Sequence, residues 1–295
     1  MRILLVEPEF PISDKSRNHK RFLPIGLLKI ASFLRKQGHE VRLCRGNIDS
    51  DFEPGQVMIT SLFTYWSKHI WNSVAFYRQH YPAAKIIVGG IYATLMPEHC
   101  KKSGCDEVFI GVHQEAENCS PAFDLVDVDY QIIHTSRGCI KQCKYCGAHK
   151  LEPKFLFKKS VRSEIVKDNL VFYDNNLLAN PYIESILREI IDLRRNGKRI
   201  RCESQCGFDG GLLLTKPHLA KLIKQAGFRY PKIAWDGSVA ERDQIKKQIS
   251  LLCKAGFERK DIAVFMLYNC EIDFYKMEHK RVECWKWKVQ ISDCR

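Results

Sequence analysis

Three cysteines stand close together near the middle of the chain, at a spacing suited to binding metal. They are Cys139, Cys143 and Cys146, in the run Thr-Ser-Arg-Gly-Cys-Ile-Lys-Gln-Cys-Lys-Tyr-Cys that begins at residue 135. Three thiolates on one short loop can hold three irons of a four-iron, four-sulfur (4Fe-4S) cluster, and such clusters usually have four thiolate ligands. The next cysteine is Cys202. The fourth iron is therefore open to a small-molecule ligand, as one position is in catalytic metal sites.

Two other interpretations of these cysteines stay open. Zinc would need a fourth ligand, which His134 or His149 could supply, although zinc ribbons usually present paired C-x2-C motifs. Buried thiols unrelated to metal are the third possibility. The chain has 13 cysteines, an odd number, and nothing in it indicates secretion, so a disulfide framework is not expected. Cys202, Cys206 and Cys270 leave a second cluster as a weaker alternative to buried free thiols.

Length and composition describe a globular protein of one large or two ordinary domains. The chain has 295 residues, of which 45% are apolar and 27% charged. The longest apolar stretch, 85–96, contains Gly89 and Gly90 and is too short to span a membrane. The apolar run at the N-terminus is too short for a signal peptide, so we expect a cytoplasmic protein. A net charge of +13 favours acidic partners such as nucleotides or RNA, or is only a solvated basic surface.

The first part of the chain alternates between strand and helix patterns. Apolar residues recur at helical spacing in 24–37 and 67–81. We predict strands at 2–6, 40–44, 57–60, 85–88 and 107–110. This alternation predicts an α/β fold with an open, doubly wound parallel sheet, which we place in a Rossmann-like (flavodoxin-like) domain over residues 1–117. Such sheets bind ligands at the carboxyl ends of their strands. An acidic segment, 118–129, is the predicted linker.

A second series of strands begins at Tyr130 and continues to the end of the chain. The predicted strands are 131–135, 170–173, 201–205, 232–235, 263–267 and 287–291, with helices at 182–195, 217–225 and 240–255. Six strands that alternate with helices favour a six-stranded partial (β/α)6 TIM-type barrel over residues 130–295. The three cysteines directly follow its first strand.

At these cysteines the sequence resembles the radical S-adenosylmethionine (SAM) superfamily, whose hallmark is C-x3-C-x-aromatic-C. Tyr145 fills the aromatic position. The resemblance implies a 4Fe-4S cluster on Cys139, Cys143 and Cys146 whose open iron binds SAM. It implies reductive cleavage of SAM to a 5′-deoxyadenosyl radical that abstracts a hydrogen atom from substrate. A reductase or flavodoxin-type electron donor is the implied partner.

Further contacts follow from the resemblance, at positions after the predicted strands. Asp174 and Asn175 stand where the family holds the SAM amine, although they depart from its common Gly-Gly-Glu form and could instead form a turn or a helix cap. Candidates for the ribose and carboxylate side are Glu203, Ser204, Gln205 and Asp236, and Tyr145 is the candidate for the adenine. Tyr268 ends the fifth predicted strand and is the candidate catalytic residue, facing substrate or adenine.

The first domain resembles the cobalamin-binding domain that is often fused to radical SAM barrels. The similarity lies in short motifs, among them Thr60-Ser61-Leu62 and Val88-Gly89-Gly90. It implies that Thr60, Ser61, Leu62, Gly89 and Gly90 embrace the nucleotide tail of cobalamin. The family's cobalt-ligating Asp-x-His-x-x-Gly is absent, since Asp14 and His19 have the wrong spacing. Cobalamin without histidine ligation and an empty flavodoxin-like domain are both open.

The leading hypothesis is thus a cobalamin-dependent radical SAM enzyme, with methylation of an unactivated carbon as the favoured reaction and rearrangement or ring contraction as alternatives. A radical SAM enzyme that modifies tRNA or another nucleic acid is the second hypothesis, weakly supported by the charge. The third is a non-catalytic, zinc-stabilised binding module. No residue pattern identifies the substrate, which could be a small molecule or a macromolecule.

Overall fold

The protein, described here from a computed structural model, folds into two compact units. The structure describes residues 1–12, 23–49, 51–195, 197–267 and 273–294. The first unit comprises residues 1–127 with 150–152, and the second comprises 128–149 with 153–295. The segment predicted as a linker, 118–129, lies mostly inside the first unit: Ala122 is buried there, and its backbone N–H donates to the carbonyl of Leu28 at 3.0 Å.

The first unit alternates strands with helices, as the sequence predicts. Its strands are β1 (Arg2–Glu7), β2 (Glu40–Arg45), β3 (Gln56–Ser61), β4 (Lys85–Gly90) and β5 (Glu107–Val108). Its helices are α1 (Ile25–Lys36), α2 (Ser67–His80), α3 (Ile91–Leu95), α4 (Pro97–Lys101) and α5 (Gln114–Glu117), with 3-10 turns η1 (Thr64–Trp66) and η2 (Phe123–Leu125).

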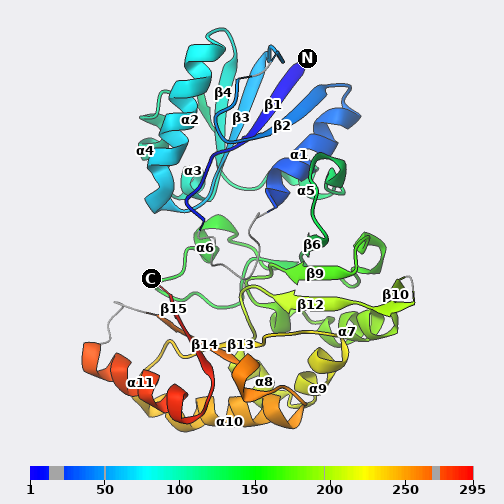
Figure 1. Ribbon diagram of the computed structural model, residues 1–295, viewed down its shortest axis with the longest axis vertical. Helices are drawn as coiled ribbons and strands as arrows, with labels where there is room; N and C mark the ends of the chain where they lie inside the picture. The colour runs from blue at the N-terminus through cyan, green and yellow to red at the C-terminus, as the bar shows by residue number, and fades with distance from the viewer. Residues whose placement is uncertain (13–22, 50, 196, 268–272, 295) are drawn as a thin grey trace. The chain divides into compact units, whose positions relative to one another are not determined.

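The five strands form one parallel sheet in the order β2-β1-β3-β4-β5, which confirms the predicted parallel α/β sheet. Successive side chains of β1 point to opposite faces of the sheet and so contribute to two separate apolar layers. Ile3 and Leu5 pack with the α1 residue Leu27, whereas Leu4 pairs with the α2 residue Ile70 in the other core. The two helices lie on opposite faces of the sheet (Figure 1). All carboxyl ends of the strands consequently meet at one edge.

The second unit contains the remaining elements. Its strands are β6 (Tyr130–Ile133), β7 (Ser136–Arg137), β8 (Leu156–Phe157), β9 (Asn169–Phe172), β10 (Arg194–Arg195), β11 (Lys198–Arg199), β12 (Arg201–Ser204), β13 (Lys232–Ala234), β14 (Ala263–Leu267) and β15 (Gln290–Cys294). Its helices are α7 (Ile183–Asp192), α8 (Gly210–Thr215), α9 (His218–Gln225), α10 (Arg242–Lys254) and α11 (Phe274–Lys286), with η3 (Arg162–Glu164), η4 (Leu177–Ala179), η5 (Val239–Glu241) and η6 (Arg259–Asp261). The short α6 (Ala148–Leu151) spans the division between the units.

The six main strands of this unit form two parallel three-stranded sheets, β6-β9-β12 and β13-β14-β15. A continuous six-stranded partial barrel is therefore not confirmed. Between the sheets, Cys202 forms a parallel bridge with Phe228, and the N–H of Phe208 donates to the carbonyl of Lys232 at 2.7 Å. The helices pack on one side of both sheets around a single core, which includes Phe172, Ile233 and other buried apolar residues.

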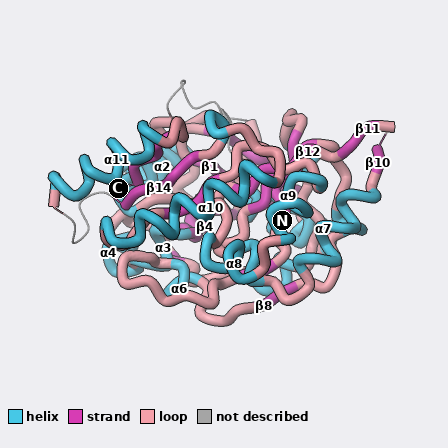
Figure 2. Tube along the Cα trace, turned by 90° about the horizontal axis from the view of Figure 1, so that it is seen from below, coloured by secondary structure: helices cyan, strands magenta, loops and turns pink. Residues whose placement is uncertain are grey.

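The end of the chain differs from the sequence prediction. Residues 287–291 were predicted as the sixth strand, but β15 begins only at Gln290, and the preceding helix α11 was not predicted. Its many charged side chains hide the helical pattern, yet Met277 and Cys284 are buried in the core. The predicted helix 182–195 also ends early, at Asp192, and a β10–β11 hairpin follows. The hairpin and α11 lie at opposite ends of the second unit (Figure 2).

Within the described ranges, no helix is both long enough and apolar enough to cross a membrane.

Candidate cofactor sites

The three cysteines of the motif lie on one loop that leaves the end of β6. We call residues 135–148 the cysteine loop. Cys139 and Cys143 are half-buried, Cys146 is exposed, and all three are free thiols. Backbone N–H groups donate to two of them, from Lys141 to the Sγ of Cys139 at 3.3 Å and from Ala148 to the Sγ of Cys146 at 3.5 Å. Such hydrogen bonds to sulfur are among the features that tune iron–sulfur clusters.

The thiols are not gathered into a finished metal site. In the part of the chain that the structure describes, no group of three or more His, Cys, Asp or Glu side chains is arranged to hold a metal ion. Neither the cluster ligands nor a zinc set with His134 or His149 is thus preassembled. The donor chemistry fits iron and sulfide, because three thiols share one partly exposed loop, but the loop has to draw them together around the metal.

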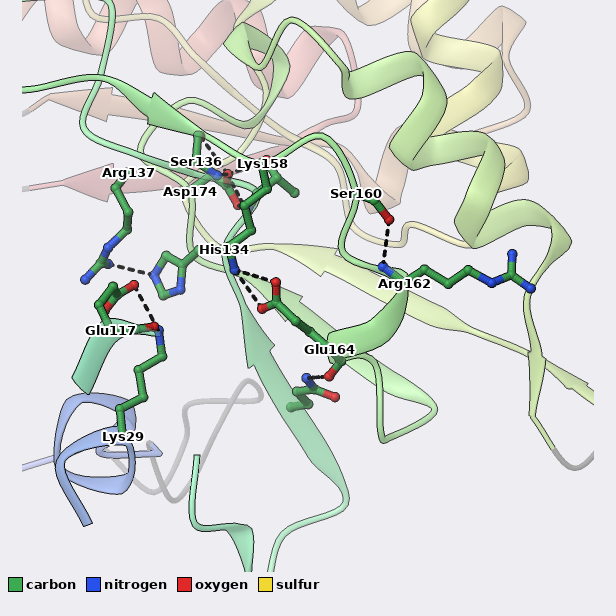
Figure 3. Close-up of polar contacts among 12 residues, drawn as sticks. Lys29, Glu117, His134, Ser136, Arg137, Lys158, Ser160, Arg162, Glu164 and Asp174 are labelled. Atoms are coloured by element: carbon green, nitrogen blue, oxygen red, sulfur yellow. Dashed lines mark hydrogen bonds and ion pairs between the residues drawn. The ribbon is translucent and has the colours of Figure 1, made fainter. Parts of the chain in front are cut away.

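Asp174, a predicted contact of the SAM amine, makes several hydrogen bonds within the chain. Its side chain is fully buried at the end of β9. One carboxylate oxygen, Oδ1, accepts bonds from the N–H and hydroxyl of Thr135, at 3.0 and 2.6 Å, and from those of Ser136, at 2.6 and 2.7 Å. Figure 3 shows Asp174 against Ser136 at the start of the cysteine loop. The other oxygen, Oδ2, accepts the N–H of Thr135 at 3.1 Å, so the carboxylate bonds mainly to the start of the cysteine loop.

Two more aspartates bind the middle of the loop. Asp209 follows β12 and lies 2.6 Å from the Nζ of Lys141, and Asn176 donates to the same carboxylate oxygen at 3.0 Å. Burial of Asp209 opposes its ionised form, but the bonds from Lys141 and Asn176 outweigh this cost and hold the pKa of Asp209 below its ordinary value. Asp236 follows β13 and accepts the hydroxyl of Tyr145 at 2.7 Å.

The predicted SAM contacts Asn175, Ser204 and Gln205 differ in their exposure and in their hydrogen bonds. Asn175 is exposed. Ser204 is buried and donates to the carbonyl of Gly207 at 2.8 Å, a bond within its own turn. The side-chain oxygen of Gln205 is buried and accepts no hydrogen bond within the described part of the chain. Gln205 therefore has an acceptor to offer a ligand, whereas Ser204 is committed to the fold.

A second buried polar atom accompanies Gln205. Phe172 and Cys202 belong to the core, so by strand alternation Tyr173 and Glu203 lie on the opposite face of the sheet. Within the described ranges, the hydroxyl of Tyr173 is buried and makes no hydrogen bond. Burial, followed by nearby groups that include Glu203, raises the pKa of Tyr173, which keeps this hydroxyl a donor. Buried polar atoms are normally satisfied, so a water molecule or a polar group of a ligand would fit against these two oxygens.

Lys232 completes this polar face. It lies at the start of β13, and its Nζ is 2.5 Å from the carboxylate of Glu203. Both side chains are largely buried. The face therefore combines a buried ion pair with the two unsatisfied oxygens of Tyr173 and Gln205. Gln205 is among the predicted SAM contacts and Tyr173 is not, although strand alternation from Phe172 was a usable signal for Tyr173.

The remaining cysteine and tyrosine predictions are resolved in part. Cys202 is fully buried, and burial raises the pKa of its thiol, which disfavours the thiolate form that binds metal. Cys206 is exposed. Tyr268, the predicted catalytic residue, and Cys270 lie outside the described residues, as do Asp14 and His19 of the first unit.

The predicted cobalamin contacts of the first unit are neighbours at the carboxyl edge of its sheet. Thr60 pairs with Gly89, and Ser61 with Gly90. The hydroxyl of Ser61 donates to the carbonyl of Gly89 at 2.8 Å and accepts the N–H of Ala93 at 3.0 Å. Gly90 has φ +99°, and a Cβ there would lie 2.3 Å from the carbonyl oxygen of Ser61. Only glycine fits this close approach of two backbones.

Apolar side chains that were not predicted flank these motifs. Leu62 is half-buried, but Phe63 and Tyr65 beyond it are 43% and 70% exposed, and their rings stack with centroids 5.1 Å apart. Ile91, after β4, and Ile110, after β5, are exposed as well. Exposed apolar groups at the end where parallel sheets bind ligands fit a large, flat, partly apolar cofactor. The signal was in the sequence, as aromatic residues directly after a strand.

Comparison with known families supports this assignment of the first unit. The model of the B12 binding domain family matches residues 20–120. The match covers Thr60, Ser61, Leu62, Gly89 and Gly90 and supports a cobalamin-binding, Rossmann-like domain, as is typical of cobalamin-dependent enzymes. A search of curated proteins finds none that matches the chain.

Proposed function

We propose that this chain is a cobalamin-dependent radical SAM enzyme. The observation that carries the proposal is the C-x3-C-x2-C loop at the carboxyl end of a parallel strand, in a chain that also matches a B12 binding domain. Cys139, Cys143 and Cys146 would each bind one iron of a 4Fe-4S cluster. The open iron would take SAM, and the cobalamin domain favours transfer of a methyl group to carbon.

When bound, the cluster and SAM would supply a 5′-deoxyadenosyl radical able to abstract hydrogen from an unactivated carbon. The residues of the chain would bind SAM and shield the radical. Gln205 and Tyr173 would offer an acceptor and a donor to polar groups of SAM from the polar strand face. Tyr145, fixed by Asp236, would border the adenine. Glu203 and Lys232 would satisfy each other and leave no unpaired charge near a carbon radical.

In the first unit, the close pairing of Ser61 with Gly90 would leave backbone groups of Thr60 and Gly89 near the nucleotide tail. The exposed Phe63 and Tyr65 would offer an apolar surface to the ring system. The chain supplies no histidine at the spacing of the cobalt-ligating motif, so we expect these strand-end residues, and no histidine of that motif, to hold cobalamin.

The test is anaerobic reconstitution with iron and sulfide, followed by absorption and electron paramagnetic resonance (EPR) spectra with and without SAM. We expect a brown protein with about four irons per chain, whose reduced EPR signal shifts when SAM is added. Cys139→Ser, Cys143→Ser and Cys146→Ser should each lose that signal. Cys253→Ser, which changes a half-buried thiol on α10, should keep it. A colourless protein with one zinc per chain would overturn the proposal and favour a zinc-stabilised binding module.

Cobalamin binding is tested separately, by the absorption spectrum of protein isolated after incubation with hydroxocobalamin. An excess of free cobalamin with none retained would favour an empty flavodoxin-like domain. A modifier of nucleic acid would instead show tRNA binding that weakens steeply with salt.

A further inference from the structure

The cysteine loop is held at three points by three aspartates, each of which follows a different strand. Asp174 follows β9, Asp209 follows β12, and Asp236 follows β13. Each binds a different part of the loop. β9 and β12 are parallel to β6, so their carboxyl ends lie at the same edge of that sheet as the end of β6 from which the loop starts. Asp236 reaches the loop from the end of a strand of the other sheet.

The three contacts are distributed along the loop in an orderly way. Asp174 binds the backbone at Thr135 and Ser136, before the first cysteine. Asp209 binds Lys141, which lies between the first and second cysteines.

Asp236 completes the series. It binds Tyr145, between the second and third cysteines. Every interval between cysteines therefore contains one side chain tied to the sheet, and the segment before the first cysteine is tied as well.

The hydrogen bonds from the loop to these aspartates restrict the backbone of the cysteine loop. Asp174 is fully buried and only 6% of the Asp209 side chain is exposed, so water competes poorly for these carboxylates, whereas Lys141 and Tyr145 are exposed and their contacts are weaker tethers. Bonds to an ionised carboxylate are roughly twice as strong as neutral ones, which strengthens the contact of Asp209, whose pKa lies below its ordinary value. Asp209 also accepts the N–H groups of Gly211 and Leu212 at the start of α8, which holds the carboxylate itself in place.

We propose that Asp174, Asp209 and Asp236 are positioning residues that set the path of the cysteine loop before any metal binds. As far as it concerns the cluster, the inference rests on the proposed function. The metal-free loop would keep its backbone near one path, so that drawing the three thiols together around iron would cost less ordering. Loss of one tether would leave the thiols chemically intact but slow or weaken their assembly around the cluster.

The experiment uses the full chain and four variants: Lys141→Met, Asp209→Asn, Tyr145→Phe and Asp236→Asn. Lys260→Met is the matched control, since it removes an exposed ion pair with Glu258 in the same unit that does not involve the loop. The first readout is hydrogen–deuterium exchange of residues 135–148 in metal-free protein. We expect exchange about fivefold to tenfold faster in each loop variant and unchanged in the control.

Pairwise combination sharpens the test. Lys141→Met with Asp209→Asn should exchange no faster than the worse single variant, because both remove the same contact, and the Tyr145 and Asp236 pair should behave likewise. Additive effects within a pair would contradict a shared contact. Since Asp174 variants could fail to fold, Thr135→Val and Ser136→Ala test that tether by removing one hydroxyl donor each.

The second readout is iron bound after reconstitution, together with the EPR signal of the reduced cluster. The loop variants should bind iron more slowly or to a lower stoichiometry than Lys260→Met. Unchanged exchange and unchanged iron loading in all loop variants would overturn the inference. If the unaltered chain binds no iron while the variants still exchange faster, the positioning role stands and the proposed function fails.

Discussion

At the scale of single residues, the sites depend on a few side chains and glycines held in unusual environments. Gly90 is the clearest case, because its backbone is left-handed and Ser61 leaves no room for a side chain. Glu7, at the carboxyl end of β1, is another. It is 8% exposed, and its carboxylate lies 2.8 Å from the guanidinium of Arg45.

Gly90→Ala should destabilise the first unit by about 3 kcal/mol, through left-handed strain plus the clash with Ser61. Gly104→Ala is the control, because Gly104 is also left-handed (φ +86°) but has no atom within 4 Å of the added Cβ. It should cost only about 1 kcal/mol. Urea unfolding measures both, and equal losses would show that the close approach to Ser61 contributes nothing.

Burial of Glu7, opposed by Arg45, raises the pKa of its carboxyl from 4.5 to about 7. The folded state then binds the proton more tightly than the unfolded state, so stability falls as pH rises from about 4.5 to about 7 and is level above that. The loss due to this group is on the order of 3 kcal/mol. Glu7→Gln should lack it. Free energies of unfolding at pH 4.5, 6 and 8 check this, and parallel pH curves for the two proteins would disprove it.

At the scale of elements, both units have their candidate site residues just after the carboxyl ends of strands. In the first, β3 and β4 end in a Ser-Gly contact beside exposed aromatic rings. In the second, the strand ends carry aspartates that hold a loop. In the second unit the helices pack on one side of both sheets. One of them, α11, also contacts a strand end, because its Lys280 is fully buried and donates to the carbonyl of Trp235 at 2.9 Å. That carbonyl directly precedes Asp236, so α11 supports the strand end that binds Tyr145.

The start of α11 should be sensitive to its cap. Asp273 accepts the N–H of Lys276 at 3.0 Å. Asp273→Ala should cost about 1 kcal/mol and speed hydrogen exchange at the start of 274–286, whereas Asp273→Asn, a good cap, should cost only a few tenths. Equal losses in the two variants would show that the charge of Asp273, and not its capping bond, matters.

At the scale of the whole molecule, the two units have separate hydrophobic cores. A chain of this kind need not unfold in one step. A cofactor that binds one unit should stabilise that unit alone, by an amount set by its concentration relative to the dissociation constant.

We therefore expect two thermal transitions, of which hydroxocobalamin raises only one. At one hundred times the dissociation constant, the gain is about 2.7 kcal/mol. Cobinamide, which lacks the nucleotide tail, should stabilise less, since Thr60 to Leu62 and Gly89 to Gly90 are proposed to bind the tail. Differential scanning calorimetry measures both. Equal stabilisation by the two ligands would show that these residues do not bind the nucleotide tail.

Much of the first unit could be predicted from sequence because its determinants are local. Apolar alternation in β1 and helical spacing in α1 and α2 are readable over short windows, and Thr60, Ser61, Gly89 and Gly90 fall at strand ends whatever the detailed packing. The cysteine spacing is local too, so the candidate metal ligands needed no structure. Boundaries failed where charge masked periodicity, as in α11, and the sixth strand was placed three residues early as a result.

The sequence by itself determined that the chain alternates strands with helices, that three thiols share one loop, and that two strand-end motifs face a ligand edge. Only the tertiary structure decided what Asp174, Asp209 and Asp236 do. A carboxylate after a strand can bind a ligand or the chain itself, and the choice depends on which donors the fold brings within about 3 Å. Thr135 lies 39 residues before Asp174, Lys141 lies 68 residues before Asp209, and Tyr145 lies 91 residues before Asp236. No local pattern reports a contact over such separations.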